Sequence, residues 1–322
     1  MKRLTRLFVT LMGFTLITAG LALAAEVELV AKKIDDPQAP KIDGKVDKIW
    51  DRARAKKVTV SEGPQGDVRI SLKALYTDTD VYFLFRWPDN TKSLSRFYEF
   101  DGNEWKKAKG NEDYFALARN IANSIKDFPK KGCTVFCHKQ DKQIFLRTNA
   151  PSERIDYWFH KPQRTNPVGQ ADDQYLTHEL KKGKSSARRG DPKTAGGYKG
   201  NWDKKAKRPK YQFKAGVNPG PILLKTDAVE IKDYGKFKPG DRLPRDVLAR
   251  AVGSRGDIQS GAVWEKRRWT LELKRARLTG DEEHDVQFTG SGPYYFGMSV
   301  WDNEDDEHHS HTGKNVVKFL MK

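Results

Sequence analysis

Cysteine is scarce in this chain, since Cys133 and Cys137 are the only two among 322 residues. At most one internal disulfide can form, and a zinc site on these thiols would need a further ligand that nothing nearby is spaced to supply. Methionine is also rare, and only Met298 and Met321 follow the N-terminal segment. Beyond that segment no apolar run is long enough to span a membrane, and no repeat of fixed period is visible.

The N-terminal segment has the three parts of a secretory signal peptide. Lys2, Arg3 and Arg6 form a positive region, residues 7–23 are nearly all apolar or small, and small residues precede Glu26. The alternative is a membrane anchor, but the apolar run is shorter than the roughly 20 residues that a spanning helix needs. We expect cleavage after residue 25 and a periplasmic or otherwise exported mature protein without an integral membrane span.

Acidic residues are outnumbered, with 43 Asp and Glu against 60 Lys and Arg. The formal net charge of +17 falls to +14 when the three basic residues of the leader are removed. Such a charge implies an acidic partner or surface. Nucleic acid is the usual candidate, but export argues against it and no nucleic-acid-binding motif appears. An acidic redox partner fits better, and solubility alone is the simple alternative.

Period-two alternation of apolar and polar residues is the strongest structural signal. It runs through residues 68–74 and 81–87 and predicts a hairpin, with further strands over 269–274, 294–301 and 316–320. Residues 114–125 show helical spacing and predict a short helix, whereas residues 181–210 are basic, rich in Gly and suited to a surface excursion. We predict an all-β fold, an antiparallel β-sandwich with helical and long loop insertions, forming one domain over residues 26–322.

The segment Cys133-Thr134-Val135-Phe136-Cys137-His138 carries the chemistry. The common haem c attachment signature is Cys-x-x-Cys-His, in which two thiols add to the porphyrin vinyl groups and the histidine becomes the proximal iron ligand. Here three residues separate the cysteines, which a local bulge could accommodate. The sequence therefore predicts haem c on Cys133 and Cys137 with His138 on the iron. A disulfide across one helical turn is the main alternative.

A haem that transfers electrons usually has a sixth ligand. The sequence offers Lys161 and His160 between aromatic residues, Met298 in a predicted buried strand, and a cluster of His308, His309 and His311. Each has an ordinary alternative, because Met298 suits a core, a lone lysine suits the surface and the histidine cluster suits a solvated turn. The residues alone do not choose among them.

Several segments together resemble one family. Lys41-Ile42-Asp43-Gly44 with Asp47 and Trp50, and the hairpin ending in Phe85-Arg86-Trp87-Pro88-Asp89, resemble sandwich domains related to family 9 carbohydrate-binding modules. A second resemblance is to the haem-binding domain of ethylbenzene dehydrogenase γ subunits. It rests on the stretch from Trp158-Phe159-His160-Lys161-Pro162 to Gly169, followed by Ala171-Asp172-Asp173. That group includes γ subunits of type II molybdenum oxidoreductases such as nitrite oxidoreductase.

The resemblance implies a periplasmic electron-transfer subunit, not itself an enzyme. It would relay electrons between molybdopterin and iron–sulfur subunits of an oxidoreductase and an external soluble redox carrier. Such γ subunits hold a b-type haem through Met and Lys, so Lys161 becomes the leading second ligand. Two arrangements stay open: one haem c, or a haem c with a second, non-covalent haem b on Lys161 and Met298.

Two other functions compete with electron transfer. A binding module of the carbohydrate-binding type would use exposed aromatic residues, for which Trp87, Trp105 and Trp202 are candidates, and would carry a Cys133–Cys137 disulfide. A haem-based sensor would keep a five-coordinate iron that binds small ligands.

Overall fold

The computed structural model describes residues 26–61, 63, 66–140, 143–290, 292–303, 310–313 and 315–322. The leader predicted over residues 1–25 lies outside the described part of the chain, as do His308, His309 and the side chain of His311.

The predicted hairpin is confirmed as strands β3 (Val68–Tyr76) and β4 (Asp80–Pro88), which pair antiparallel with Ser71 opposite Arg86. Three residues separate the two strands, and the Thr77 amide donates to the Asp80 carbonyl at 2.9 Å to close the turn. Alternate side chains of β3 are buried, as the period-two pattern requires for a strand with one face on the core.

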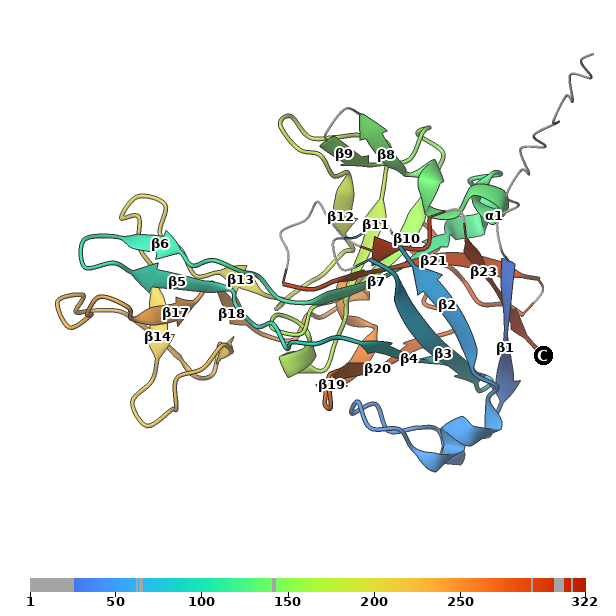
Figure 1. The fold of residues 1–322 in the computed structure, drawn as a ribbon, viewed down its shortest axis with the longest axis horizontal. Coiled ribbons are helices and arrows are strands. Elements are labelled where there is room, and N and C mark those ends of the chain that lie inside the picture. Colours follow the sequence, from blue (N-terminus) through green and yellow to red (C-terminus); the bar gives the residue numbers. More distant parts are fainter. Residues whose placement is uncertain are drawn as a thin grey trace, which may run out of the picture.

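One long sheet, bent at β1, forms the body of the molecule (Figure 1). The first half runs in the order β12 (Arg188–Gly190), β11 (Asp172–Leu176), β10 (Ile155–His160), β7 (Tyr114–Asn120), β21 (Tyr294–Trp301), β23 (Val316–Met321) and β1 (Glu26–Lys33). The second half continues through β3, β4, β20 (Arg268–Ala276) and β19 (Gln259–Trp264), with β2 (Lys56–Val60) paired to β3 and β22 (Ser310–His311) to β21.

Strand β1 joins the two halves because its pairing partner changes along its length. Residues 26–31 pair parallel with β23, and Lys32 and Lys33 pair parallel with β3. The other pairings of this sheet are antiparallel. The halves therefore face each other as a sandwich, which confirms the predicted all-β class.

The main core fills the space between the halves. It takes alternate side chains from both, such as Phe83 and Phe85 of β4 against Trp158 of β10 and Phe296 of β21. Successive strand residues point to opposite faces, so the intervening side chains of β7, β10 and β21 lie on the outer face of the first half. That outer face is covered by a second apolar cluster, which includes Cys133 and Phe136.

The helix predicted over residues 114–125 is wrong. Residues 114–120 form strand β7, and all seven of its residues are buried, while residues 121–123 form a short 3-10 turn. A central strand buried on both faces lacks the alternation that marks a half-exposed strand, so its apolar residues can imitate helical spacing.

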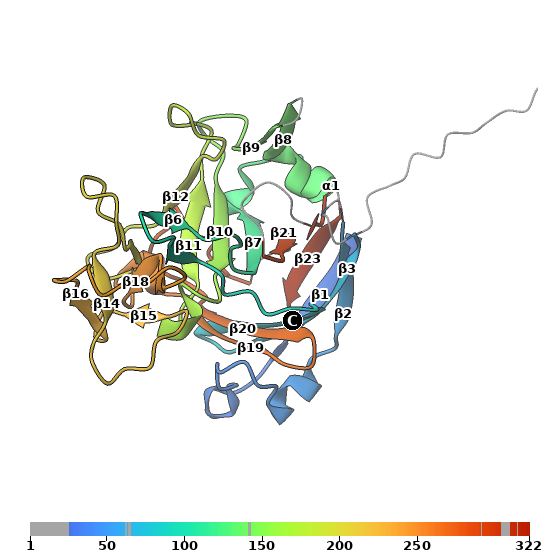
Figure 2. The same ribbon diagram turned by 60° about the vertical axis from the view of Figure 1, so that its left-hand side comes forward.

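Short helices occur only in the connections of the described residues. The α-helix is α1 (Phe128–Lys131), and the 3-10 helices are η1 (Asp36–Gln38), η2 (Lys48–Arg52), η3 (Ile121–Asn123), η4 (Gly132–Val135), η5 (Asn166–Val168) and η6 (Ser254–Gly256). Helix α1 and the hairpin of β8 (Cys137–Gln140) and β9 (Gln143–Leu146) lie together beside the first half of the sheet (Figure 2).

Two long connections build an extension at one end of the sandwich, at the left of Figure 1. Its strands are β5 (Phe97–Phe100), β6 (Trp105–Lys107), β13 (Lys199–Gly200), β14 (Tyr211–Phe213), β15 (Leu223–Leu224), β16 (Ala228–Glu230), β17 (Arg242–Pro244) and β18 (Asp246–Leu248). A small cluster of Tyr98, Trp105, Ile231 and Leu243 forms its core.

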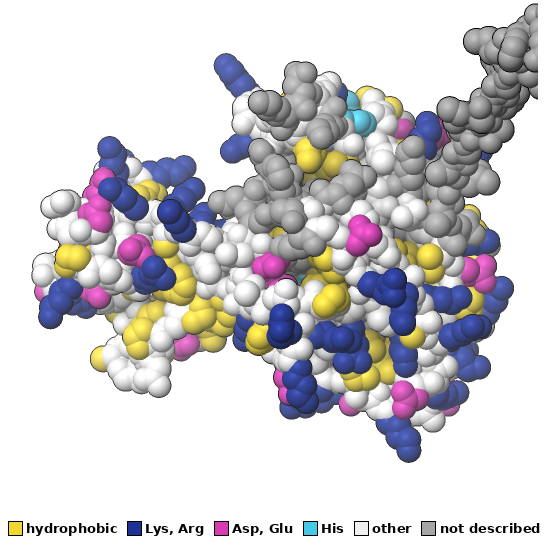
Figure 3. Space-filling view, viewed as in Figure 1, with side chains coloured by type: hydrophobic (Ala, Val, Ile, Leu, Met, Phe, Trp, Pro, Cys, Tyr) yellow, Lys and Arg dark blue, Asp and Glu magenta, His cyan; other side chains and the backbone are white. Residues whose placement is uncertain are grey.

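The basic segment 181–210 combines exposed and buried parts. It begins at the surface, then supplies edge strand β12 and the buried residues Ala187, Asp191 and Asn201. The Tyr198 hydroxyl reaches Asp172 of β11 at 2.9 Å. Lys and Arg side chains are spread over the visible faces of both the sandwich and the extension (Figure 3).

Candidate functional site

The cysteine segment lies across the outer face of β7, β10 and β21. Gly132 begins η4 with φ +54°, and a Cβ there would stand 2.4 Å from the Gly313 carbonyl oxygen, so only glycine fits. This close approach lets the Cys133 amide donate to the same carbonyl at 2.9 Å. The segment is thereby fixed to the connection between β22 and β23.

Cys133 and Cys137 line one cavity of about 70 Å³ between the segment and the sheet. Ala116 and Ala118 of β7 form its floor with short side chains, and aromatic rings close its sides. The full lining comprises Ala116, Ala118, Cys133, Phe136, Cys137, Ile144, Leu146, Tyr157, Ser185, Ser186, Arg188, Ser299 and Trp301. The structure thus brings both predicted haem-attachment thiols to one mostly apolar pocket.

The two thiols have different environments. Cys133 is 3% exposed, burial raises the pKa of its thiol to about 12, and its Sγ lies 3.3 Å from the Thr312 hydroxyl. Cys137 is half-buried at the start of β8. No disulfide joins these two residues in the described part of the chain. The disulfide of the alternative interpretation is therefore not formed here.

His138 does not share this cavity. Strand β8 points Cys137 and His138 to opposite sides, and His138 is absent from the lining. Its Nε2 lies 3.1 Å from the Arg147 carbonyl oxygen. The sequence places His138 beside Cys137 along the chain, but the strand conformation separates their side chains.

Lys161, just after β10, is 2% exposed instead of lying at the surface as a lone lysine usually does. Its ammonium contacts the Asp172 carboxylate and lies 2.9 Å from the Tyr198 hydroxyl. Arg255 donates to the same carboxylate at 2.7 Å. Burial lowers the pKa of the Lys161 amine to about 7, although Asp172 opposes that shift.

Aromatic rings connect Lys161 to the cysteine cavity. Its Nζ lies 4.5 Å from the centre of the Phe159 ring, which is 5.4 Å from the ring of Trp301. Trp301 lines the cavity, and so does Arg188, whose guanidinium lies 4.7 Å from the Phe159 ring. Lys161 and the two cysteines therefore lie along the same outer face of the sheet.

His160 and Met298 lie on the other face. Met298 is 1% exposed in the core between the sheets, while its neighbours Gly297 and Ser299 face the cysteine segment. His160 is 1% exposed, its Nδ1 lies 2.9 Å from the Ser260 hydroxyl, and burial lowers the pKa of its imidazole to about 3. Neither side chain is brought to the cysteine cavity.

A binding module would expose aromatic side chains, but two of the three candidate tryptophans are buried. Trp87 is 3% exposed in the main core, and Trp105 is 7% exposed in the core of the extension. Trp202 is partly buried, with its ring 4.4 Å from that of Tyr98. The pattern of tryptophans reflects packing at these positions.

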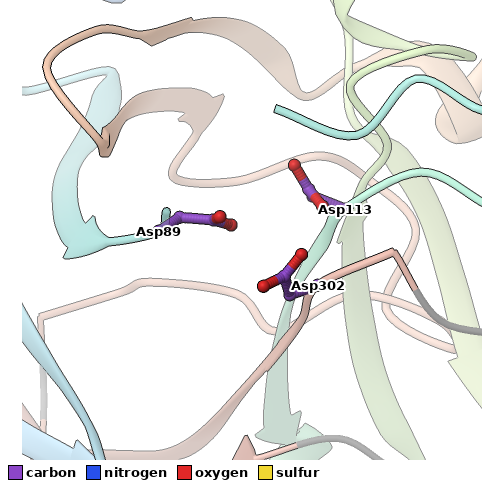
Figure 4. Close-up of side chains that lie close together, drawn as sticks. All are labelled: Asp89, Asp113 and Asp302. Carbon is purple, nitrogen blue, oxygen red and sulfur yellow. The ribbon is translucent and has the colours of Figure 1, made fainter. Parts of the chain in front are cut away.

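Several carboxylates that are distant in the sequence cluster in the structure. Asp89, Asp113 and Asp302 approach one another where β4, β7 and β21 meet (Figure 4). Asp113 accepts hydrogen bonds from the Ser93 amide at 2.9 Å and the Asn303 amide at 3.0 Å, and burial raises the pKa of its carboxyl to about 7. These residues are far apart in the chain, so no local motif could have grouped them.

A second set, Asp156, Asp173 and Asp285, lies inside the sandwich around Arg275. Of these three, only Asp173 lies in one of the sequence motifs described above, the Ala171-Asp172-Asp173 stretch that resembles ethylbenzene dehydrogenase γ subunits. Among the residues that the structure describes, no helix is long and apolar enough to cross a membrane.

Comparison with known proteins gives one match by family and several by fold. The family model described as ethylbenzene dehydrogenase matches residues 47–313. No curated protein matches the chain. Similar solved structures include a family 9 carbohydrate-binding module from Caldicellulosiruptor kristjanssonii in complex with cellotriose, at 10% identity and a TM-score of 0.35, covering 92% of this chain and 95% of that one. Another is a putative carbohydrate-binding protein from Bacteroides uniformis, at 7% identity and a TM-score of 0.39, covering 91% and 99%.

The matched region includes the cysteine segment, Lys161 and the carboxylates around it. The match spans most of the chain, and its domain is typical of the haem-binding γ subunit of an oxidoreductase complex. The chain therefore belongs to the ethylbenzene dehydrogenase family.

Proposed function

We propose that this protein is an exported, haem-carrying electron-transfer subunit of an oxidoreductase complex, with its haem on the outer face of the β7–β10–β21 sheet. One observation carries the proposal: Cys133 and Cys137 line the same cavity in a chain whose family is typified by a haem-binding subunit. A haem bound there supplies a one-electron carrier.

The residues around the cavity suit the edge of a porphyrin chemically. Each cysteine thiol can add across a vinyl double bond, so that a carbon–sulfur bond forms, the thiol hydrogen goes to the second vinyl carbon and no oxidant is needed. Tyr157 and Trp301 offer apolar ring surface, and Ala118 leaves room above the sheet. Arg188 at the rim supplies a guanidinium for a propionate carboxylate.

The volume of the cavity sets a condition on this proposal. About 70 Å³ is well below the roughly 300–1,000 Å³ of typical ligand pockets. Haem attachment therefore requires the β8–β9 hairpin, which carries Ile144 and Leu146 over the cavity, to shift outward. His138 would hold the iron only after leaving the Arg147 carbonyl oxygen, which lies 3.1 Å from its Nε2.

Lys161 is the proposed second axial ligand. An amine binds iron only when it is neutral, and burial already lowers its pKa to about 7. Tyr198 and Asp172 hold its Nζ on the outer face, where it lies 4.5 Å from the centre of the Phe159 ring. Burial of Lys161, which is 2% exposed, would keep water from the site and thereby tune its redox potential.

The proposed partners are the catalytic and iron–sulfur subunits of a molybdenum oxidoreductase, or a soluble redox carrier. The net charge of +14 expected after removal of the three leader cations favours a partner with an acidic docking surface, since opposite charges speed encounter. Secretion through the N-terminal segment fits covalent attachment, because thioether bonds keep the haem in place outside the cytoplasm.

The test is to produce the full chain with periplasmic export and cytochrome c maturation. A pyridine haemochrome spectrum and the intact mass are then measured. We expect a haem c spectrum and the mass of the mature chain plus one haem. Cys133→Ala and Cys137→Ala should each convert a two-thioether to a one-thioether spectrum, and the double variant should lose covalent haem. A mature protein without a Soret band would refute the proposal and favour a binding module.

The axial ligands are tested separately. His138→Ala should alter the Soret band and weaken haem retention, while His178→Ala, a partly exposed histidine, serves as its control. Lys161→Met should shift the visible spectrum and the reduction potential, whereas the exposed Lys225→Met should shift neither. A six-coordinate spectrum unchanged in Lys161→Met would remove Lys161 from the iron. Rapid CO binding by the wild type would instead indicate a five-coordinate sensor.

A further inference from the structure

A group of five aspartates lies between the two halves of the sandwich. Two come from neighbouring strands, β10 and β11, and three from connections: after β12, after η6 and between β20 and β21. The residues are Asp156, Asp173, Asp191, Asp257 and Asp285. Asp156, Asp173 and Asp285 each place a carboxylate oxygen within 4.8 Å of the other two, and Asp285 does the same with Asp191 and Asp281.

The burial of these carboxylates is severe. Asp156 and Asp173 are fully buried, Asp285 is 1% exposed and Asp191 is 2% exposed. Carboxylates are almost never buried unless a cation or several donors compensate their charge. The group therefore needs positive charge from somewhere in the protein or from an ion.

Arg275 of β20 compensates only part of the charge. Its Nη1 donates to Asp156 at 3.0 Å and to Asp285 at 2.9 Å, but it stays 3.7 Å from Asp173, too far for a hydrogen bond. Arg119 is the other buried arginine nearby. Its guanidinium lies 3.5 Å from the centre of the Trp158 ring, and its nitrogens find no hydrogen-bond partner among the described residues.

Six oxygens of this group lack hydrogen-bond partners within the described part of the chain. They are Asp156 Oδ1, both carboxylate oxygens of Asp173, Asp191 Oδ1, Asp257 Oδ1 and Asp285 Oδ2. Asp173 is decisive because it is fully buried and neither of its oxygens accepts a hydrogen bond from outside the group, its side-chain contact being with the carboxyl of Asp257. Leaving such groups unsatisfied is costly, so an orphaned carboxylate aimed into an acidic group points to a missing cation.

We propose that Asp173 and its neighbouring aspartates bind a divalent cation of the calcium type inside the sandwich. Calcium takes six to eight oxygen ligands in flexible geometry, and Asp156, Asp173 and Asp285 each bring one carboxylate oxygen within 4.8 Å of the other two, without sulfur or nitrogen. The five carboxylates carry three more negative charges than the two arginines neutralise, and a divalent cation would largely balance this excess.

The other acidic group, shown in Figure 4, lacks this feature. Asp113 accepts the Ser93 and Asn303 amides and the Trp269 indole at 3.2 Å, and Asp89 accepts the Thr91 amide at 3.0 Å. Its carboxylates are thus held by the protein itself. The comparison gives a matched control within the same chain.

The proposed ion has a structural consequence near Lys161. Asp172 and Asp173 are consecutive in β11 and point to opposite faces, Asp172 to Lys161 and Asp173 into the sandwich. An ion on Asp173 would therefore fix the strand that positions Lys161. The cation site stands independently of the proposed haem, because it lies on the opposite face of the sheet.

The experiment uses the full mature chain, measured with and without bound haem. We expect the purified protein to retain calcium after dialysis, as measured by elemental analysis, and its melting temperature to fall with EGTA and recover with CaCl₂. When the free calcium concentration is 100-fold above its Kd, binding to the folded state raises the ratio of folded to unfolded protein by about 100-fold. Magnesium should act more weakly, since it requires a stricter octahedral geometry.

Variants locate the ion. Asp173→Asn and Asp191→Asn should fold but lose both retained calcium and the calcium-dependent rise in melting temperature, while Asp89→Asn keeps both. As a second measurement, Tb³⁺ bound to the wild type should luminesce when tryptophan is excited, because the Trp158 ring lies 4.7 Å from the Arg275 guanidinium beside the site.

Three outcomes would overturn the proposal. One is wild-type protein that retains no calcium and whose melting temperature ignores calcium and EGTA. Another is an unchanged calcium response in Asp173→Asn, and the third is loss of that response in Asp89→Asn alone. In the first case the carboxyls would be neutralised by protons instead.

Discussion

Replacement of Gly297 by alanine tests how tightly the cysteine segment is held against the sheet. Gly297 lies in β21 directly beneath Cys133, and an ideal Cβ at this position would stand 2.2 Å from Cys133 Sγ and 3.0 Å from Thr312 Oγ1. Non-bonded carbon contacts are favourable at about 3.5–4.0 Å. The Cys133 sulfur must therefore move by more than 1 Å, as a rough estimate from that contact range.

Cys133 has little freedom to move. Its amide donates to the Gly313 carbonyl, and the preceding Gly132 already lies so close to that carbonyl that no side chain fits. Overpacking of this kind costs about 1–3 kcal/mol. With a urea m-value of about 2 kcal/mol/M, the unfolding midpoint of Gly297→Ala should fall by roughly 0.5–1.5 M.

The assay is urea unfolding of wild type and Gly297→Ala, followed by far-UV circular dichroism, with haem attachment measured by intact mass in matured protein. Gly200→Ala is the matched control, because a Cβ there meets nothing within 4 Å. We expect the control to match wild type and Gly297→Ala to lose both stability and attachment at Cys133. If Gly297→Ala equals wild type in midpoint and mass, the close packing of the cysteine segment on β21 is refuted.

Three further predictions concern buried groups. In protein made without haem maturation, Cys137 should react with a maleimide well before Cys133, because burial raises the pKa of the Cys133 thiol to about 12; peptide mass mapping decides the order, and equal rates would contradict it. Burial also raises the pKa of Glu272 to about 7, so this carboxyl binds a proton more tightly in the folded than in the unfolded state. The free energy of unfolding gained from that proton is therefore lost as pH rises from about 4.5 to 7. The fall in urea midpoint over that range should be smaller in Glu272→Gln, and an identical fall would argue against it. Arg275→Met should destabilise by about 3–5 kcal/mol, because it leaves Asp156 and its neighbours as uncompensated buried charges; a thermal melt tests this, and a variant as stable as wild type would show that protons already neutralise them.

Local sequence pattern predicted the β3–β4 hairpin, because apolar and polar residues alternate along both strands. Burial follows that alternation along β3, whereas residues 81–85 of β4 are all buried. The same logic failed for β7, whose residues are buried on both faces and carry no alternation. Its position between β10 and β21, which removes both faces from water, is a property of the sheet order and not of the seven residues themselves.

The sequence named candidate residues for the site but not how they are arranged. Cys133 and Cys137 do share one cavity, yet β8 directs His138 elsewhere, and Met298 lies on the core side of β21. Alternation along a strand says which residues share a face, but not which layer covers that face. The buried aspartates were missed because they come from five separate segments of the chain.

The all-β class, the hairpin, the close pair of cysteines and the excess of positive charge follow from the sequence alone, because each depends on neighbours along the chain. The burial of Lys161 depends instead on tertiary contacts, since its partners Asp172 and Tyr198 stand 11 and 37 residues away. The tertiary structure also decided that Asp173 faces inward with its oxygens unsatisfied. Burial and pairing of charge depend on which distant segments meet, and that is fixed when the two halves of the sheet close on each other.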